Sequence, residues 1–240
     1  SFQKFYFSLE DKYYNFIEFN ITKFNVSINE NTIDGYASLI IKENDKNIKF
    51  KILSNNVNLA DLNKFLKNKY EFNITPQNGS AKFQLSFNGN FKNIKKPTLS
   101  EINNINLDGQ ISANNASMVI NNINIKNTNA NLKITKNIVT IDTIKSNING
   151  NDINISGSLN NILPHIIDKK NLIDLKLNIY SPLLVYDSIQ NINNSTDSTY
   201  FPILPYYFNL TANIYIDKLY TNKFDLNNLN WPLALKNKGA

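Results

Sequence analysis

Hydrophobic and polar residues alternate along most of this chain. The alternation is clear over residues 5–9, 48–52, 83–87 and 175–179, where every second residue is Phe, Ile or Leu. Because successive side chains of a β-strand point to opposite faces, a period of two is typical of strands that have one apolar face and one face in water. The sequence therefore predicts a mainly β protein.

Breaks in the alternation predict where strands bend or turn. The apolar positions change parity between Ile21 and Phe24. This change predicts a β-bulge near Thr22-Lys23, since one extra residue returns the apolar set to the same face. Asn88-Gly89 and Asp108-Gly109 separate alternating segments and have the composition of two-residue turns, so they predict tight hairpins.

One segment has a different period. Between residues 58 and 70, hydrophobic residues recur three and four positions apart, which predicts one short amphipathic helix near 58–70. Asp61 lies in its first turn and lysines follow toward its end, as the helix dipole favours. Pro76 and the Asn78-Gly79 pair then predict a loop.

Short strands follow one another closely over residues 123–159, as in a meander. We expect a long antiparallel β-meander, whose apolar face could close into a barrel, pair with a second sheet or stay open as a groove. The stretch 191–200 is polar and lacks the apolar residues that would bury it. It therefore predicts a loop between a first unit, 1–190, and the start of a further β unit, 201–240.

Composition narrows the range of partners. The net charge is +6, yet all 25 basic residues are Lys. Proteins that read nucleic acids rely on the Arg fork and on clustered basic patches, so we expect no nucleic-acid partner.

The chain has no Cys, which excludes disulfides and Cys-based zinc sites. It begins at Ser1 with neither an initiator Met nor a signal-peptide pattern, so we expect a fragment of a longer protein.

No residue pattern predicts catalysis. His165 is the one histidine, and it follows Pro164 in a loop-like stretch. Asp168, three residues on, is typical of a turn or a helix start rather than of a catalytic pair. Glu10-Asp11 lacks the ligand spacing of calcium loops, and the glycines occur singly rather than in a phosphate-binding loop. We therefore expect a protein that is not an enzyme and holds no metal and no cofactor.

The middle of the chain resembles a known family. The phrases that carry the resemblance lie at 79–89, 107–111, 120–125, 130–134, 138–142 and 153–159, and a further one lies at 208–216. In them a strand ends in Gly, a set of alternating strands follows, and the unit closes on the phrase Ile153-Asn-Ile-Ser-Gly157-Ser-Leu159. This arrangement resembles the C-terminal repeat region of AsmA-like proteins of the bacterial envelope.

The resemblance implies a fold and a function. It implies a curved sheet that forms a trough or half-tube, in a periplasmic protein anchored to the inner membrane by an N-terminal segment outside this chain. It also implies that phospholipid acyl chains pass along the trough between inner and outer membrane, in support of outer-membrane biogenesis. The alternative is a surface adhesin or structural β-repeat protein with a closed, packed core.

Under the lipid-transport hypothesis, the hydrophobic residues at inward strand positions face the acyl chains. These candidate groove residues are Phe83, Leu85, Phe87, Ile123, Ile125, Leu132, Ile134, Val139, Ile141, Ile153, Ile155, Leu175, Leu177, Phe208, Leu210 and Ile214.

Overall fold

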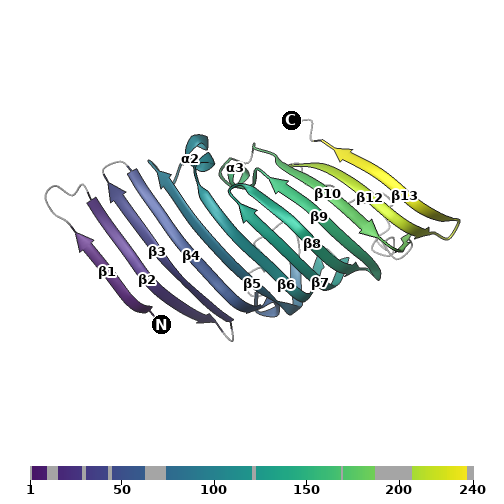
Figure 1. Ribbon diagram of the computed structural model, residues 1–240, viewed down its shortest axis with the longest axis horizontal. Helices are drawn as coiled ribbons and strands as arrows, with labels where there is room; N and C mark the ends of the chain where they lie inside the picture. Colours follow the sequence, from purple (N-terminus) through teal and green to yellow (C-terminus); the bar gives the residue numbers. More distant parts are fainter. Residues whose placement is uncertain are drawn as a thin grey trace, which may run out of the picture.

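The alternating segments form thirteen strands of one sheet in the computed structural model (Figure 1). The structure describes residues 2–9, 16–28, 31–42, 45–62, 74–120, 123–168, 170–186 and 207–236. The strands are β1 (Phe2–Leu9), β2 (Phe16–Ile28), β3 (Asn31–Lys42), β4 (Asp45–Asn58), β5 (Ile74–Phe91), β6 (Asn106–Ile120), β7 (Ile123–Thr135), β8 (Ile138–Ile148), β9 (Asn151–Asn160), β10 (Ile173–Ser181), β11 (Leu184–Val185), β12 (Phe208–Tyr220) and β13 (Asp225–Leu235). The described helices are α2 (Leu99–Asn103), α3 (Ile162–Ile167) and the 3-10 helix η1 (Leu59–Leu62).

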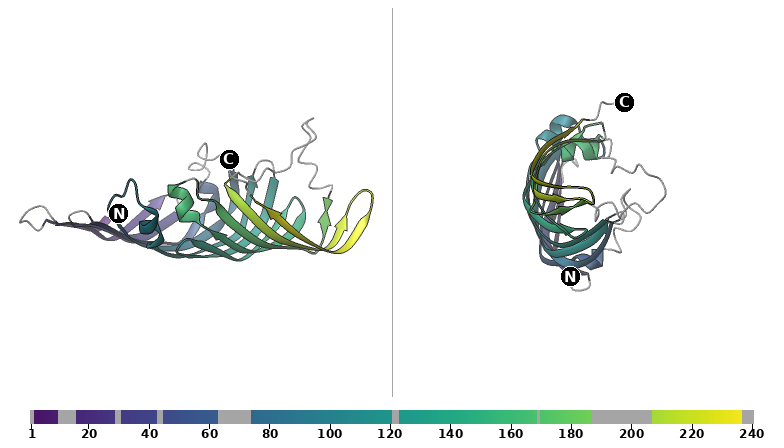
Figure 2. Two further views of the ribbon diagram at one scale, coloured as in Figure 1. Left: turned by 90° about the horizontal axis from the view of Figure 1, so that it is seen from above. Right: turned by 90° about the vertical axis from the view of Figure 1, so that its right-hand side faces the viewer.

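The sheet is open and curved. Strands β1 to β10 pair in chain order, each antiparallel to the next. Among the described strands no pairing joins β1 to β13, and the sheet curls into a trough (Figure 2). The predicted mainly β fold with a curved trough is confirmed.

The cross-strand register sorts the side chains onto two faces. Residues directly opposite each other on paired strands share a face. One row crosses the sheet through Ile52, Leu85, Gly109, Ile134, Val139, Leu159, Leu175 and Leu210. The adjacent row runs through Leu53, Gln84, Gln110, Lys133, Thr140, Ser158, Lys176 and Thr211. We call the faces that carry these two rows the apolar face and the polar face.

A line of β-bulges bends the sheet across β4 to β7. Register shifts follow Ser54 in β4, Pro76 in β5, Ala113 in β6 and Lys126 in β7. A bulge adds one residue to a strand, which bends it and increases its twist. Asn115 and Asn127 have φ of 48° and 53° there, a conformation that Asn tolerates better than most residues. Part of the Asn-rich composition therefore serves the curvature of the sheet.

Small hydroxyl groups support the bend from inside. The buried residues of this kind are Ser54, Ser117, Thr128, Ser146 and Ser181. The Thr128 and Ser146 hydroxyls are hydrogen-bonded to each other at 2.8 Å, and the Ser146 hydroxyl donates to the Lys126 carbonyl at 3.3 Å. Ser54 donates to the Thr32 carbonyl in the same way. These contacts supply partners to polar groups that would otherwise be buried without one.

The apolar face lines the concave side of the trough. Phe87 and Leu107 of this face pack against a buried cluster that contains Ile102 of α2, and Leu163 of α3 packs against the same cluster. Both helices lie on the inner side of the curve in the two views of Figure 2. The helices therefore form one rim of the trough and identify its apolar, inward side.

Three Gly-containing pairs do not form the predicted turns or loop. Asn88-Gly89 lies inside β5, and Asp108-Gly109 lies inside β6, so the two hairpin predictions are wrong. Asn78-Gly79, predicted as a loop, lies at the bulge of β5. The first two glycines make room instead, because a Cβ on Gly109 would lie 2.4 Å from Leu85 Cδ2 and a Cβ on Gly89 would lie 2.8 Å from the Phe91 ring.

The predicted bulge near Thr22-Lys23 is confirmed by the register shift between Ile21 and Phe24.

The helix predicted near 58–70 can be followed only in part. β4 runs to Asn58 and η1 forms a 3-10 turn at Leu59–Leu62, while residues 63–73 lie outside the described residues. The loop predicted at 191–200 also lies outside them, and β12 and β13 beyond it belong to the same sheet.

Two pairings depart from the expected antiparallel meander. β12 runs parallel to β10 over Ile173–Ser181 and Phe208–Ile216, and β11 is parallel to the end of β12. Parallel neighbours need a long connection rather than a two-residue turn. Alternation has the same period in both kinds of pairing, so the sequence pattern could not distinguish them.

A substitution at Gly157 would show how closely β9 and β10 approach each other. It has φ of +151°, and a Cβ there would lie 2.0 Å from the Lys176 carbonyl oxygen. We expect Gly157→Ala to destabilise the fold by about 3 kcal/mol or more, through backbone strain and overlap. The control is Gly150→Ala, where φ is +89° but no atom lies within 4 Å of the new Cβ, so the cost should be about 1 kcal/mol. Thermal unfolding compares them, and equal losses would contradict the close approach.

Candidate functional site

The structure brings all candidate groove residues to the apolar face. Leu85, Ile134, Val139, Leu175 and Leu210 share one row across five strands. The neighbouring positions on the same strands, together with β9, place the others: Phe83, Phe87, Leu132, Ile141, Ile153, Ile155, Leu177, Phe208 and Ile214. Ile123 and Ile125 lie on this face beyond the bulge of β7. Together these residues form one continuous surface, which we call the groove.

The groove is only partly covered. Ile141 is buried, at 7% exposed, and every other candidate groove residue is half-buried. Ile102 of the rim helix α2 is 2% exposed, as expected of a core residue. The difference arises because groove side chains touch neighbours along the sheet, while in the described residues no second sheet packs on them. The groove thus presents apolar side chains to whatever occupies the trough.

Charge is absent from the middle of the groove. In the described part of β5 to β10, the paired positions of the apolar face carry no Lys, Asp or Glu. Its buried polar members include Ser146, Thr128, Ser181 and Asn151, and each is hydrogen-bonded within the sheet. Such a surface can bind a hydrocarbon ligand, whereas a charged ligand would lose water contacts there without gaining a polar partner.

The rim helices are held by local hydrogen bonds. Thr98 and Glu101 form a capping box at the start of α2, and the Glu101 carboxylate also accepts the Lys92 N–H at 2.6 Å. The backbone N–H groups of Lys92 and Thr98, followed by the Thr98 hydroxyl, hold the pKa of Glu101 below its usual value. This carboxylate therefore ties the end of β5 to the start of α2.

His165 has a structural environment. It is buried in α3, where its Nδ1 lies 2.7 Å from the Asn171 carbonyl oxygen and its ring stacks on Tyr207 with centroids 4.9 Å apart. Asp168 ends the helix through its backbone N–H, which donates to the Pro164 carbonyl. Among the described residues no group of three potential metal ligands occurs. That the protein is not an enzyme stays a prediction.

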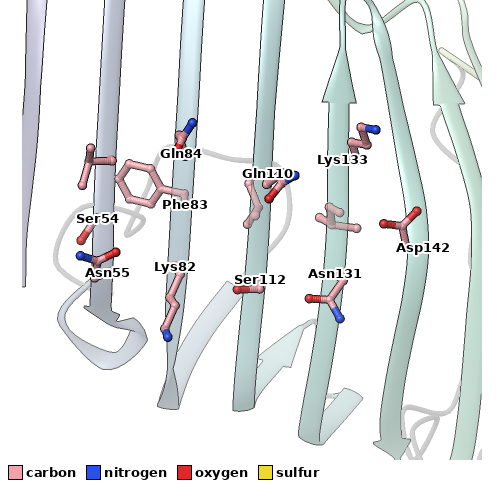
Figure 3. Close-up of a pocket in the computed structure, with 13 residues that line it drawn as sticks. Ser54, Asn55, Lys82, Phe83, Gln84, Gln110, Ser112, Asn131, Lys133 and Asp142 are labelled. Atoms are coloured by element: carbon pink, nitrogen blue, oxygen red, sulfur yellow. The ribbon is translucent and has the colours of Figure 1, made fainter.

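A shallow hollow of about 510 Å³ is lined by residues of β4 to β8 (Figure 3). Its lining combines two rows of the polar face with the apolar-face row between them. The polar-face rows run through Leu53, Gln84, Gln110 and Lys133 and through Lys82, Ser112 and Asn131, and the apolar-face row runs through Phe83, Ile111 and Leu132. Lys82 and Lys133 lie at opposite corners of the hollow in Figure 3. Both are exposed, and so are Gln84, Gln110 and Asp142. Ser54 of the lining is buried, and its hydroxyl donates to the Thr32 carbonyl within the sheet.

Elsewhere the polar face is joined by side-chain hydrogen bonds between strands. Asn47 donates to Asn90 at 2.6 Å, and Asn213 donates to Asn178 at 3.2 Å. The Tyr180 hydroxyl donates to Asp217 at 2.5 Å, which raises the pKa of Tyr180. These contacts give the Asn-rich face a role in holding the strands together in water.

Comparisons of the chain with family models, with curated proteins and with solved structures found no match. No helix in the described residues has the length and hydrophobicity needed to cross a bilayer. The AsmA-like resemblance therefore stays a prediction.

The sequence interpretation missed the two rim helices. A signal for α2 was present, since Thr98 and Glu101 have the spacing of a capping box. α3 begins after Asn161, which has φ of 65° and makes no side-chain capping bond, so it had no comparable signal. Because neither helix was predicted, the buried cluster around Ile102 was not predicted either.

The partial cover of the groove has a measurable consequence for stability. We expect Ile134→Ala to lower the free energy of unfolding by about 1–2 kcal/mol, because its side chain is only half-buried. Ile102→Ala should cost about 3–4 kcal/mol, because it leaves a cavity in the rim cluster. Urea unfolding of both variants provides the comparison. A larger loss for Ile134→Ala would indicate that the groove is a packed core.

The lowered pKa of Glu101 predicts an acid-sensitive rim. Because the folded pKa lies below the unfolded value, the carboxylate stabilises the rim above the usual Glu range, and this contribution is lost as pH falls through the folded pKa. An NMR titration of the Glu101 side chain should show a midpoint below 4.5. Glu101→Gln should remove the pH dependence of the Lys92 and Thr98 amide shifts. A midpoint at or above 4.5 would contradict the capping geometry.

Proposed function

We propose that the groove binds phospholipid acyl chains and that this chain is a non-enzymatic segment of an AsmA-like envelope protein. In this proposal the trough carries phospholipid between inner and outer membrane in support of outer-membrane biogenesis. The protein is periplasmic, and a segment outside this chain anchors it to the inner membrane. The observation that carries the proposal is the continuous, half-exposed apolar face across β5 to β12.

The energetics favour a hydrocarbon occupant. Soluble monomers rarely expose a contiguous apolar patch of more than a few hundred Å². Each methylene group that leaves water for such a surface contributes about 0.8 kcal/mol, so even part of an acyl chain would bind appreciably. The polar face stays in water, and the uncharged middle of the groove lets a chain lie across several strands.

Native mass spectrometry of the purified chain tests the proposal. We expect phospholipid to remain bound to the unaltered protein. Ile134→Asn with Leu175→Asn should lower the bound fraction at least tenfold, because both side chains lie in the central row of the groove and each new amide loses water contacts on lipid binding. The matched control changes the adjacent, outward residues, Lys133→Asn with Lys176→Asn, and should keep the lipid.

A lipid-free protein that also takes up no added phospholipid would overturn the proposal. Equal loss of lipid in the groove variant and in the outward control would overturn it as well, since binding would then not depend on the apolar face. A lipid-free protein whose groove side chains are inaccessible to apolar probes would favour the adhesin or structural alternative with a closed core.

A further inference from the structure

A patch of exposed apolar and basic residues lies on the rim of the trough. Ile94, Leu99 and Ile166 are 42%, 51% and 61% exposed. Lys92, Lys95 and Lys96 are exposed in the segment that joins β5 to α2. α2 and α3 are in contact, and Figures 1 and 2 show them side by side at one edge of the sheet. We call these six residues the basic rim.

The segment that carries the basic rim is held in a fixed conformation. The Glu101 carboxylate accepts the N–H groups of Lys92 and Thr98, both at 2.6 Å. The Lys46 ammonium donates to the Lys92 carbonyl at 2.8 Å. A turn follows, in which the Lys96 N–H donates to the Asn93 carbonyl at 3.2 Å. These bonds present the exposed side chains in one arrangement, which lowers the entropy lost on binding.

Ile94 and Leu99 are exposed although a buried apolar cluster lies in the same segment. Ile102 and Ile105 come from the same stretch of chain and are buried at 2% and 4% exposed. Burial of these two side chains holds the segment against the sheet. Ile94 and Leu99 therefore point to solvent although an apolar cluster lies close to them, so their exposure results from the fold of the segment.

The chemistry of the basic rim fits an anionic bilayer surface. Lysines near such a surface are attracted by its negative potential, and neighbouring apolar side chains insert at the boundary between headgroups and acyl chains. The one carboxylate in the segment, Glu101, is engaged with backbone N–H groups. A nucleic acid would gain nothing from the three apolar side chains.

We propose that the basic rim docks on the surface of an anionic membrane. Lys92, Lys95 and Lys96 pair with lipid phosphates, and Ile94, Leu99 and Ile166 insert between the headgroups. Because both helices lie at one edge of the sheet, docking by the basic rim brings this edge of the trough to the bilayer (Figure 1). Docking requires only the rim residues and does not depend on lipid in the groove.

Vesicle flotation with the full chain tests docking. We expect the protein to float with vesicles of phosphatidylcholine and phosphatidylglycerol, to bind pure phosphatidylcholine vesicles at least tenfold more weakly, and to dissociate in high salt. Replacing Lys92, Lys95 and Lys96 by Gln should weaken binding to the anionic vesicles at least tenfold, since each lysine near the surface contributes about fivefold. Replacing Ile94, Leu99 and Ile166 by Asn should weaken it to a similar degree.

The matched control replaces Lys82, Lys133 and Lys176 by Gln on the polar face, which changes the net charge by the same amount. This control should bind anionic vesicles like the unaltered protein, and circular dichroism should show all variants folded. Equal loss in the control and the rim variant would overturn the proposal, because binding would then follow net charge alone. Equal binding to neutral vesicles, or binding to an acidic polypeptide but not to vesicles, would also overturn it.

Two further measurements separate docking from lipid carriage. The rim-lysine variant should retain co-purified phospholipid, because it leaves the groove intact. The groove variant, Ile134→Asn with Leu175→Asn, should still float with anionic vesicles. A groove variant that lost vesicle binding would place membrane contact in the groove and overturn the assignment to the rim.

Discussion

A sheet with one apolar face needs something to cover that face, and this constraint governs the whole structure. In most β proteins a second sheet or a layer of helices provides the cover. Here two short helices and a cluster around Ile102 cover one rim, and the described residues form one sheet with no second one behind it. Curvature does part of the work, because a concave face brings its own side chains closer together. The remaining exposure defines the groove.

The curvature has an identifiable origin in the residues. Bulges in four neighbouring strands fall along one line, and Asn115 and Asn127 take the left-handed conformation that two of them require. Buried hydroxyls such as Ser146 and Thr128 satisfy polar groups at the bend. Gly109 in the apolar row leaves space for Leu85, which a larger residue would occupy. Some of the Asn, Ser and Gly residues of the chain therefore determine the shape of the trough, a role that their number in the sequence does not reveal.

The sequence predicted the parts of the structure that have a local periodic signal. Alternation identified the strands, and it assigned residues such as Leu85, Ile134 and Leu175 to one face, because side-chain direction follows from the period of two. The sequence interpretation failed where residues that are common in turns have another role inside a strand. Asn-Gly is a turn signal, yet Asn88 lies on the polar face beside Asn47 and Gly89 makes room for Phe91. Parallel pairing of β10 and β12 was also out of reach, since it depends on the path of the chain and not on local pattern.

The residues that hold the sheet together differ from the groove residues that we propose bind lipid. Strand pairing, the polar-face hydrogen bonds and the rim cluster around Ile102 hold the sheet, and none of these side-chain contacts involves the central row of the groove. Groove residues are half-buried, so a polar substitution there loses less packing energy than one in a closed core. An apolar face that contributes modestly to folding has contact energy left for a ligand. We therefore expect polar substitutions in the groove, such as Ile134→Asn, to leave the protein folded.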